Sequence, residues 1–226
     1  AEATVRDPDP GKRVAAMDGL AAYLEPYLNA RRGTDGEDLL SRTVNADIGG
    51  RPISAAEALG ASIHLLMAGL DTVSSLLSFV MLFLAQNPEH RRALAQKPDL
   101  IPSASLELIR RFPIVTMARQ ARGDFTIQGT EFRQGDMVAI ASHLFNLDPS
   151  IYERPLEVDW SRPVHKTLTF GNGPHRCPGA LLGRNELVIG LQEWLRHIPD
   201  FQLEPGAEIS VCGGTVAKIT KLPLVW

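Results

Sequence analysis

Residues 170–179 read FGNGPHRCPG, and residues 180–197 directly after them read ALLGRNELVIGLQEWLRH. The second stretch has the apolar spacing of a helix and predicts one from Ala180 to His197. The first stretch contains Cys177 among three glycines. A cysteine just before a helix N-terminus is held as a thiolate, because backbone N–H groups and the helix dipole favour negative charge there. The two stretches together therefore predict a thiolate ligand on a close-fitting loop.

The spacing inside residues 170–179 matches Phe-x-x-Gly-x-x-x-Cys-x-Gly, with Phe170, Gly173, Cys177 and Gly179 at its four defined positions. In this pattern, placed just before a helix, the chain resembles the cytochrome P450 family of haem-thiolate monooxygenases. The resemblance implies haem b (iron protoporphyrin IX) as the cofactor and Cys177 as the axial ligand to its iron. Thiolate donation favours cleavage of the O–O bond of iron-bound dioxygen.

The same resemblance implies further contacts with the haem. Phe170 is expected to pack beside the sulfur and limit access of water, while Gly171 and Gly179 let the backbone come close. His175 resembles the histidine that holds a haem propionate in camphor-hydroxylating members, and Arg119 falls at the register of their propionate arginine. We therefore expect these five residues to bind the cofactor.

Other roles for a cysteine were weighed against this one. A lone cysteine is most often a small buried hydrophobe, and that interpretation stands for Cys212, which lacks such surroundings. A zinc site needs three or four ligands, and the loop offers only His175 and Cys177. A nucleophilic cysteine needs a base and an oxyanion site, which the sequence does not reveal. The pattern around Cys177 favours the haem ligand.

A long helix is predicted upstream, between a capping box at Ser54-Ala55-Ala56-Glu57 and the pair Asn87-Pro88. It spans about 32 residues, or roughly 48 Å at 1.5 Å per residue. The apolar stretch from Ile63 to Ala85 is long enough to cross a membrane, but polar residues interrupt its middle. We therefore expect a central helix that is buried inside protein.

Within this helix, Ala68-Gly69-Leu70-Asp71-Thr72 resembles the oxygen-binding segment of the family. The resemblance implies that Gly69 leaves room for dioxygen and that Asp71 and Thr72 deliver protons. By themselves, such residues in a long helix are more often packing contacts or tolerated imperfections. Their place upstream of the cysteine loop, in the order that the family requires, favours the catalytic role.

Glu107 and Arg110 are spaced i to i+3 and share one helix face, which by itself indicates an ordinary surface ion pair. They match the Glu-x-x-Arg of the family, and Arg162 occupies the register of an arginine that completes a buried cluster there. A carboxylate bridged by two guanidinium groups would fix the loop beneath the haem. We expect this trio to be structural rather than catalytic.

The likeness is greatest to camphor hydroxylase and related bacterial terpene hydroxylases, for example in the terminal Pro223-Leu224-Val225-Trp226. It implies dioxygen, a small apolar, terpenoid-like substrate, and electrons from NADH through a reductase and a two-iron ferredoxin. The positions that match the substrate pocket are His64, Met67, Ala68, Val115, Met117, Thr215 and Val216. Met117 replaces an aspartate of the camphor enzyme. His64 is the weakest member, because a histidine on an apolar helix face is more often a packing residue.

Composition sets the wider frame: 226 residues, formal net charge −3 and 44% hydrophobic residues are typical of a globular protein. The charge balance gives no reason to expect nucleic acid or a membrane surface as a partner. Two cysteines and an N-terminus without a secretory pattern favour the cytoplasm.

We expect a mainly α fold with a small β region. Helices are predicted at 14–31 with a bend at Pro26, at 38–45, from Asn87-Pro88 onward, and from Pro102 to Arg111. A hairpin at 125–132 joined through Gly129-Thr130, a strand at 137–141, a long loop at 148–166 and a β-like tail make up the rest.

The chain is expected to be a single domain, residues 1–226, that forms the C-terminal part of the family fold. About 180 N-terminal residues of the usual length of about 400 then have no counterpart. Two other functions stay open, a haem-thiolate enzyme that uses peroxide directly and a non-catalytic haem-binding or interaction protein. Intact Asp71 and Thr72 favour dioxygen activation over the peroxide enzyme.

Overall fold

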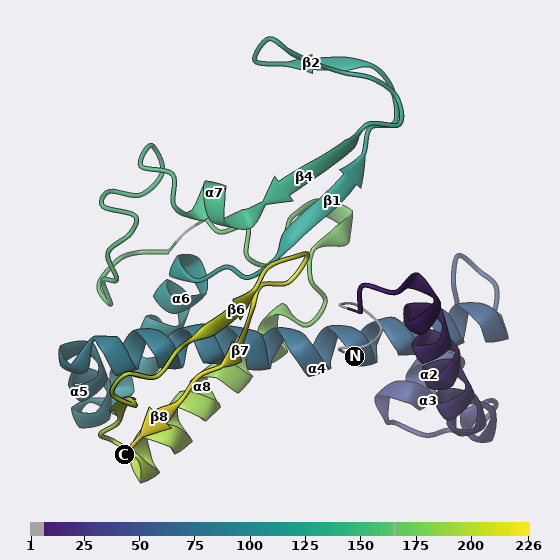
Figure 1. The fold of residues 1–226 in the computed structure, drawn as a ribbon. Coiled ribbons are helices and arrows are strands. Elements are labelled where there is room, and N and C mark those ends of the chain that lie inside the picture. The colour runs from purple at the N-terminus through teal and green to yellow at the C-terminus, as the bar shows by residue number, and fades with distance from the viewer. Residues whose placement is uncertain (1–6, 165) are drawn as a thin grey trace. The chain divides into compact units, whose positions relative to one another are not determined.

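The computed structural model describes residues 7–164 and 166–226, and its architecture is the mainly α fold with a small β region that the sequence predicts (Figure 1). The helices are α2 (Pro10–Arg31), α3 (Leu39–Val44), α4 (Ala55–Gln86), α5 (Pro88–Gln96), η1 (Pro98–Leu100), α6 (Ile101–Arg111), α7 (Ser142–Asn146), η2 (Gly173–His175) and α8 (Ala180–His197). The strands are β1 (Thr116–Gln120), β2 (Phe125–Ile127), β3 (Thr130–Phe132), β4 (Met137–Ala141), β5 (Gln202–Leu203), β6 (Ser210–Cys212), β7 (Lys218–Lys221) and β8 (Leu224–Val225).

The chain forms two compact units, Ala1–Asp71 and Thr72–Trp226, and the boundary between them falls inside α4. The expectation of a single domain stays a prediction. In the first unit, α2 and α3 pack around a small apolar core that consists of Leu24, Leu28, Val44, Ile53 and Ala58. Asp9 caps α2 through Gly11, and Pro26 lies inside the helix as predicted.

The larger core belongs to the second unit and lies where α6 and the C-terminal half of α4 meet α8. Its fully buried side chains include Leu84, Leu94, Leu108, Leu187 and Leu191. Burial of each such side chain contributes about 1.5–3 kcal/mol relative to exposure. Gly190 of α8 faces Leu77 of α4, and a Cβ atom at Gly190 would lie 3.5 Å from the Leu77 side chain. This packing gives α8, and the loop before it, a rigid base.

α4 has the predicted bounds, and the capping box is formed. The Ser54 amide donates to the Glu57 carboxylate at 2.9 Å, and the Glu57 amide donates to the Ser54 hydroxyl at 3.2 Å. The expectation of a buried helix is wrong for the described residues, since only 22% of its most apolar 18-residue window is buried. By length and composition α4 can also cross a membrane. Its buried apolar residues belong to the core of one unit or of the other, and the turns at the unit boundary are partly exposed.

The β region consists of antiparallel pairs, β1 with β4, β2 with β3, β5 with β8 and β6 with β7. The hairpin β2–β3 turns through Gln128-Gly129, with φ of 48° and 81°, one residue earlier than predicted. β1 was not predicted, although it pairs with β4 along its whole length, from Thr116 opposite Ala141 to Gln120 opposite Met137. The short helix α7 was also missed.

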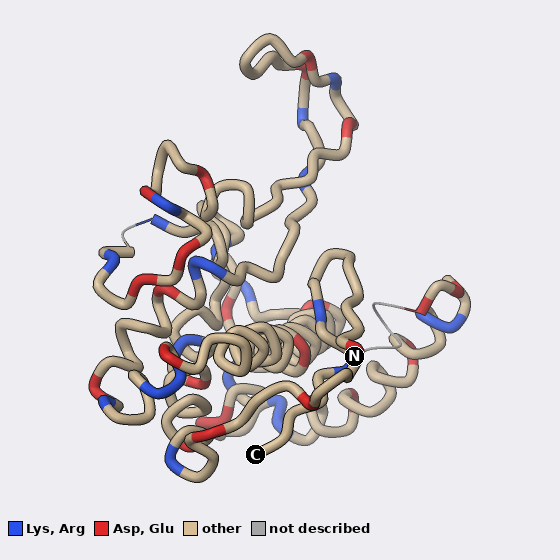
Figure 2. The backbone as a smooth tube through the Cα atoms, turned by 60° about the vertical axis from the view of Figure 1, so that its left-hand side comes forward, with Lys and Arg blue, Asp and Glu red and all other residues tan. Residues whose placement is uncertain are grey.

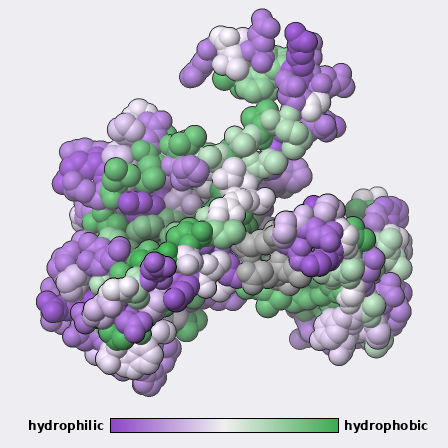
Figure 3. All heavy atoms as spheres, in the orientation of Figure 1, coloured by the Kyte–Doolittle hydropathy of each residue, from purple (hydrophilic) through white to green (hydrophobic). Residues whose placement is uncertain are grey.

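Charge and hydropathy are mixed over the described surface. Figure 2 shows Lys and Arg interspersed with Asp and Glu along the chain, without a long segment of one sign. Figure 3 shows hydrophilic residues over much of the face in view, including the outer part of the hairpin β2–β3. This distribution fits the near-neutral balance expected from the composition.

The cap of α3 generates a pH prediction. Asp38 accepts hydrogen bonds from the Ser41 hydroxyl at 2.6 Å and from the Ser41 amide at 3.1 Å, and Arg31 adds a weaker contribution. The Ser41 bonds lower the pKa of the Asp38 carboxyl to about 2. Because the folded pKa is depressed, the cap contributes stability above the ordinary aspartate pKa and loses it as pH falls toward 2.

We expect Ser41→Ala to move the midpoint of the Asp38 carboxyl titration, followed by carbon NMR, back toward the ordinary aspartate value. Thr43→Val, two residues further on the same helix, is the control and should leave it unchanged. An unshifted midpoint in Ser41→Ala would contradict this account of the cap.

Candidate functional site

The cysteine loop runs from Phe170 to Gly179 and ends at the N-terminus of α8. The Cys177 amide donates to the Phe170 carbonyl oxygen at 2.8 Å, which closes the loop on itself. Gly171 and Gly173 both have a φ of 69°, in the left-handed region that favours glycine. Gly179 is the residue before α8, so Cys177 lies three residues before the helix start. The loop therefore has the local structure that the sequence predicts.

The residues around Cys177 suit a ligand that binds at its sulfur. The Cys177 side chain is exposed, and among the described residues no cluster of three His, Cys, Asp or Glu side chains is placed to hold a metal. A Cβ atom at position 179 would lie 3.9 Å from the sulfur, and one at 171 would lie 3.2 Å from the Met117 sulfur. One thiolate without further protein ligands matches a metal whose other ligands come from a macrocycle, as in haem. The donor set thus fits the expected cofactor.

Predicted substrate residues from two distant segments lie together in the second unit. The Thr116 amide donates to the Thr215 carbonyl oxygen at 2.9 Å, and Val115 forms a β-bridge with Val216. This pairing brings Val115 and Met117 to the turn between β6 and β7. Because the Met117 sulfur also approaches Gly171, these residues adjoin the cysteine loop.

The remaining predicted substrate residues are on α4. His64 and Ala68 are exposed and Met67 is half-buried. They belong to the first unit, so their part in a common pocket stays a prediction.

The predicted proton-delivery segment lies at the boundary between the units. Gly69 is exposed, and a Cβ atom there would have no described neighbour within 4 Å. Asp71 and Thr72 are half-buried, and both take part in polar interactions. Val73, the residue after Thr72, lies 3.7 Å from where a Cβ atom on Gly183 of α8 would be. The start of the second unit's part of α4 therefore lies against the helix that follows Cys177.

The two predicted propionate residues lie on separate elements. His175 is exposed in the turn η2, three residues after an Asn172 side chain that accepts from the Gly173 amide at 2.8 Å. Arg119 is half-buried on β1 and donates to the Ala118 carbonyl oxygen at 2.8 Å. No direct contact between the two is observed in the described part of the chain, and their roles stay predictions.

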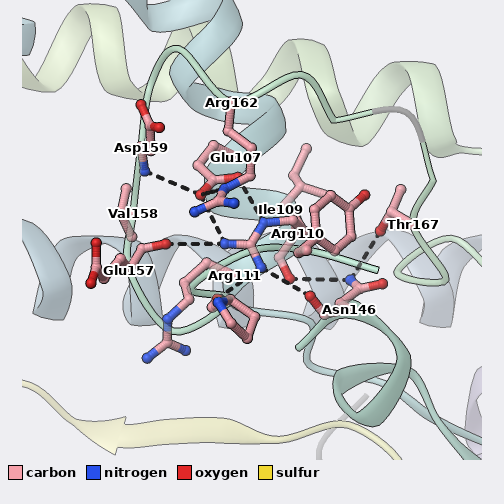
Figure 4. A network of polar contacts seen from close by, with 12 residues as sticks. Glu107, Ile109, Arg110, Arg111, Asn146, Glu157, Val158, Asp159, Arg162 and Thr167 are labelled. Atoms are coloured by element: carbon pink, nitrogen blue, oxygen red, sulfur yellow. Dashed lines mark hydrogen bonds and ion pairs between the residues drawn. The ribbon is translucent and has the colours of Figure 1, made fainter. Parts of the chain in front are cut away.

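The structure brings Glu107, Arg110 and Arg162 together (Figure 4). Glu107 and Arg110 are fully buried and form a bidentate pair, with N···O distances of 2.7 and 2.8 Å. Arg162 donates to the same carboxylate at 3.0 Å, and the Asp159 amide donates to it at 3.1 Å. The trio is thus a buried cluster and not a surface ion pair.

The cluster holds the long loop at 148–166 through backbone oxygens. Arg110 donates to Pro155 at 2.9 Å and to Glu157 at 3.2 Å, while Arg162 donates to Glu153 at 2.6 Å. The Ser161 hydroxyl and amide lower the pKa of the Asp159 carboxyl. This loop needs no regular secondary structure because its carbonyl groups find buried cationic donors.

Sequence reasoning missed Asn146, which is fully buried at the end of α7. Its side chain bonds to Leu168, Thr167 and Thr169, just before the cysteine loop, and to the carbonyl oxygen of Arg110. In sequence it stands in Phe145-Asn146-Leu147-Asp148-Pro149, where asparagine indicates a turn. The only available signal was an asparagine followed by the start of the long loop.

Comparisons with known proteins agree with the geometry. The family model described as Cytochrome P450 matches residues 12–101 and 102–212. Probable cytochrome P450 127A1 of Sinorhizobium fredii is 37% identical over 95% of this chain and 52% of its own length. The crystal structure of cytochrome P450 CYP101C1 is 41% identical, with a TM-score of 0.90 over 95% of this chain and 55% of that one.

Relatives at lower identity differ in the substrates that their names state. A vitamin D3 dihydroxylase of Streptomyces griseolus is 30% identical over 98% of this chain and 56% of its own length. The chain thus spans about half the length of the curated relatives it matches.

The buried cluster generates a stability prediction. Glu107→Gln leaves two buried guanidinium groups without their carboxylate, which typically costs about 3–5 kcal/mol. Glu193→Gln is the matched control, because Glu193 also pairs with an arginine three residues later, at 2.6 Å, but on the exposed face of α8. Urea unfolding should show a large decrease in the free energy of unfolding for Glu107→Gln and almost no decrease for Glu193→Gln. Equal losses would show that burial adds nothing to the cluster.

Proposed function

Because this chain belongs to the cytochrome P450 family, we propose that it supplies the haem-binding part of a monooxygenase, with Cys177 as the axial ligand to the iron of haem b. The observation that carries the proposal is the closed cysteine loop at the start of α8, where the Cys177 amide bonds to Phe170 and the sulfur is accessible. Since the chain spans about half the length of its relatives, the activity is proposed for the protein of the complete reading frame.

The residues around the loop have distinct proposed tasks in holding the cofactor. Gly171 and Gly179 keep the backbone close to the ligand face, because neither carries a Cβ atom. Phe170, which packs against the apolar core, limits access of water to the sulfur. His175 and Arg119 supply hydrogen-bond donors for the two propionates, and Arg119 adds a positive charge.

Bound haem supplies the activation of dioxygen and the transfer of one oxygen atom to a C–H bond. The chain itself supplies proton transfer. The Asp71 carboxyl group exchanges protons with solvent, and the Thr72 hydroxyl group donates a hydrogen bond into the pocket. Their half-buried positions suit this task, because a relay needs contact with both water and the pocket. Gly69, without a side chain, keeps the adjacent turn of α4 open for dioxygen.

The proposed substrate is a small apolar, terpenoid-like molecule. Val115, Met117 and Val216 give an apolar lining beside the cysteine loop, and Thr215 adds a single hydroxyl group. Met67, Ala68 and His64 of α4 are proposed to complete the pocket. A charged ligand would have no ionic partner among the aliphatic members and would lose several kcal/mol on burial.

Electrons are proposed to come from NADH through a reductase and a two-iron ferredoxin, in the cytoplasm. This proposal rests on the likeness to camphor and terpene hydroxylases, together with the 41% identity to CYP101C1. The presence of two cysteines, both free, is consistent with a reducing compartment.

The ligand assignment is tested by Cys177→Ala. The reduced wild-type protein with carbon monoxide should show the red-shifted Soret band of a thiolate-ligated haem, and Cys177→Ala should lose it. Cys212→Ser is the matched control and should keep it, because Cys212 lies on β6 and not on the loop. A red-shifted band that survives in Cys177→Ala would show that the ligand assignment is wrong.

The substrate class is tested by a spin-state titration of the ferric protein with monoterpenes, ionones, vitamin D3 and fatty acids. Small terpenoids should displace the iron-bound water and bind most tightly, because the pocket offers apolar surface and the adaptable Met117. Met117→Lys should weaken terpenoid binding by at least about tenfold, since an ammonium group in the pocket loses hydration on ligand binding.

Met137→Lys is the control for this titration, because Met137 lies on the neighbouring strand β4 with 68% of its surface exposed. It should leave terpenoid binding unchanged. Tightest binding of a fatty acid would overturn the terpenoid assignment, and tightest binding of vitamin D3 would replace it with a larger apolar substrate.

A further inference from the structure

Asn146 connects three segments that are distant in sequence. Its Nδ2 donates to the Arg110 carbonyl oxygen at 3.1 Å, at the end of α6. The same nitrogen lies 2.9 Å from the Thr167 hydroxyl and 2.7 Å from the Thr169 hydroxyl, so its two N–H groups are shared among three acceptors. Its Oδ1 accepts from the Leu168 amide at 2.8 Å. The side chain therefore connects α6 and α7 to the segment that leads into the cysteine loop.

The donors and acceptors around this amide fix its orientation. The Leu168 amide can only donate and must face Oδ1, whereas the Arg110 carbonyl oxygen can only accept and must face Nδ2. The Thr169 hydroxyl uses its proton toward the Ile109 carbonyl oxygen at 2.8 Å, so it accepts from Asn146. All polar atoms of the fully buried Asn146 side chain are thus in use, and an apolar side chain would leave partners unsatisfied.

Asn146 is also continuous with the buried ion cluster. The Arg110 guanidinium donates to the Asn146 carbonyl oxygen at 2.9 Å, while the Asn146 side chain donates back to the Arg110 carbonyl oxygen. Figure 4 shows Asn146 between Arg110 and Thr167, with Glu107 on the far side of the guanidinium group. Hydrogen bonds therefore run unbroken from the Glu107 carboxylate to the residues that precede Phe170.

We propose that Asn146 and Thr169 are positioning residues for the iron ligand, an inference that rests on the proposed function of Cys177. Thr169 is hydrogen-bonded to the Ile109 carbonyl oxygen and directly precedes Phe170 in the sequence. The Phe170 carbonyl oxygen in turn accepts a hydrogen bond from the Cys177 amide at 2.8 Å. Asn146 holds Thr169, and thereby holds the acceptor that anchors Cys177. When this anchor is loosened, the Phe170 carbonyl group moves, and the sulfur leaves the iron more often.

The test measures how often the sulfur becomes accessible in the haem-loaded protein of the complete reading frame. Iodoacetamide alkylates Cys177 only when its bond to iron is open, and mass spectrometry follows the peptide that contains Cys177. Alkylation of Cys212 in the same sample is the internal control, because Cys212 lies on β6 and has no contact with the Asn146 network in the described residues.

Thr169→Val removes the hydroxyl group with almost no change of shape. We expect it to raise the alkylation rate of Cys177 about tenfold, the size expected when buried hydrogen bonds are lost, with no change at Cys212. Thr43→Val is the matched control, because the Thr43 hydroxyl also donates to a helix carbonyl oxygen, that of Leu39, at 2.8 Å. It should leave both rates unchanged.

Asn146→Leu removes the whole network and also destabilises the fold, so it is compared with Leu108→Ala. Leu108 is fully buried on α6, and its truncation creates a cavity without removing a hydrogen bond to the loop. The two variants are compared at urea concentrations equally far below their unfolding midpoints. Iodoacetamide should then alkylate Cys177 about tenfold faster in Asn146→Leu than in Leu108→Ala, and the red-shifted Soret band of Asn146→Leu should be smaller.

Two results would overturn the inference: a wild-type alkylation rate in Thr169→Val, or equal rates in Asn146→Leu and Leu108→Ala. Failure of the proposed function is distinguishable from both. If the proposed function is wrong, the wild-type protein itself lacks the red-shifted band. If only the inference is wrong, the wild-type protein, Thr169→Val and Asn146→Leu all keep the band.

Discussion

The second unit depends on one buried carboxylate. Glu107 is removed from water completely, a condition that costs several kcal/mol for an ion unless strong hydrogen bonds replace its hydration. Two guanidinium groups and the Asp159 amide supply them. With two arginines and one carboxylate, the cluster has a net positive charge. The remaining N–H groups of the arginines donate hydrogen bonds to carbonyl oxygens of the long loop. The two guanidinium groups therefore order the loop through its carbonyl oxygens. The ion cluster and the loop depend on each other.

The same cluster determines where the cysteine loop begins. Arg110 and Asn146 exchange hydrogen bonds through their side chains and carbonyl oxygens, so the end of α6 and the end of α7 form one rigid corner. After this corner, Val115 and Thr116 pair with the β6–β7 turn, and the segment before Phe170 is bonded to the corner through Asn146. The predicted iron ligand Cys177 and the predicted substrate residue Met117 of β1 thus share one support, although more than 50 residues separate them in the sequence.

Features governed by neighbouring residues were predictable from the sequence. The bounds of α4 and α8, the capping box and the cysteine loop follow from caps, breakers and periodicity within a few residues. β1 was missed because Thr116-Met117-Ala118-Arg119-Gln120 alternates weakly and becomes a strand only through its pairing with β4. The five-residue α7 is too short for periodicity to show. The exposure of α4 was not predictable either, because burial depends on which elements pack against a helix and not on its own composition.

The candidate site divides in the same way. Its ligand lies in a local pattern, while Asn146 acts through residues more than 20 positions away, and nothing in its own neighbourhood indicates that. The division also explains how a loop with three glycines fixes the position of Cys177. Glycine allows the close backbone approach at Gly171 and Gly173, but it raises the entropy lost on ordering the loop. The bonds of Thr167, Leu168 and Thr169 fix one end of the loop, and α8 fixes the other. Only the ten residues between these supports must be held by contacts within the loop. The hydrogen bond from the Cys177 amide to the Phe170 carbonyl oxygen connects the two ends of this segment.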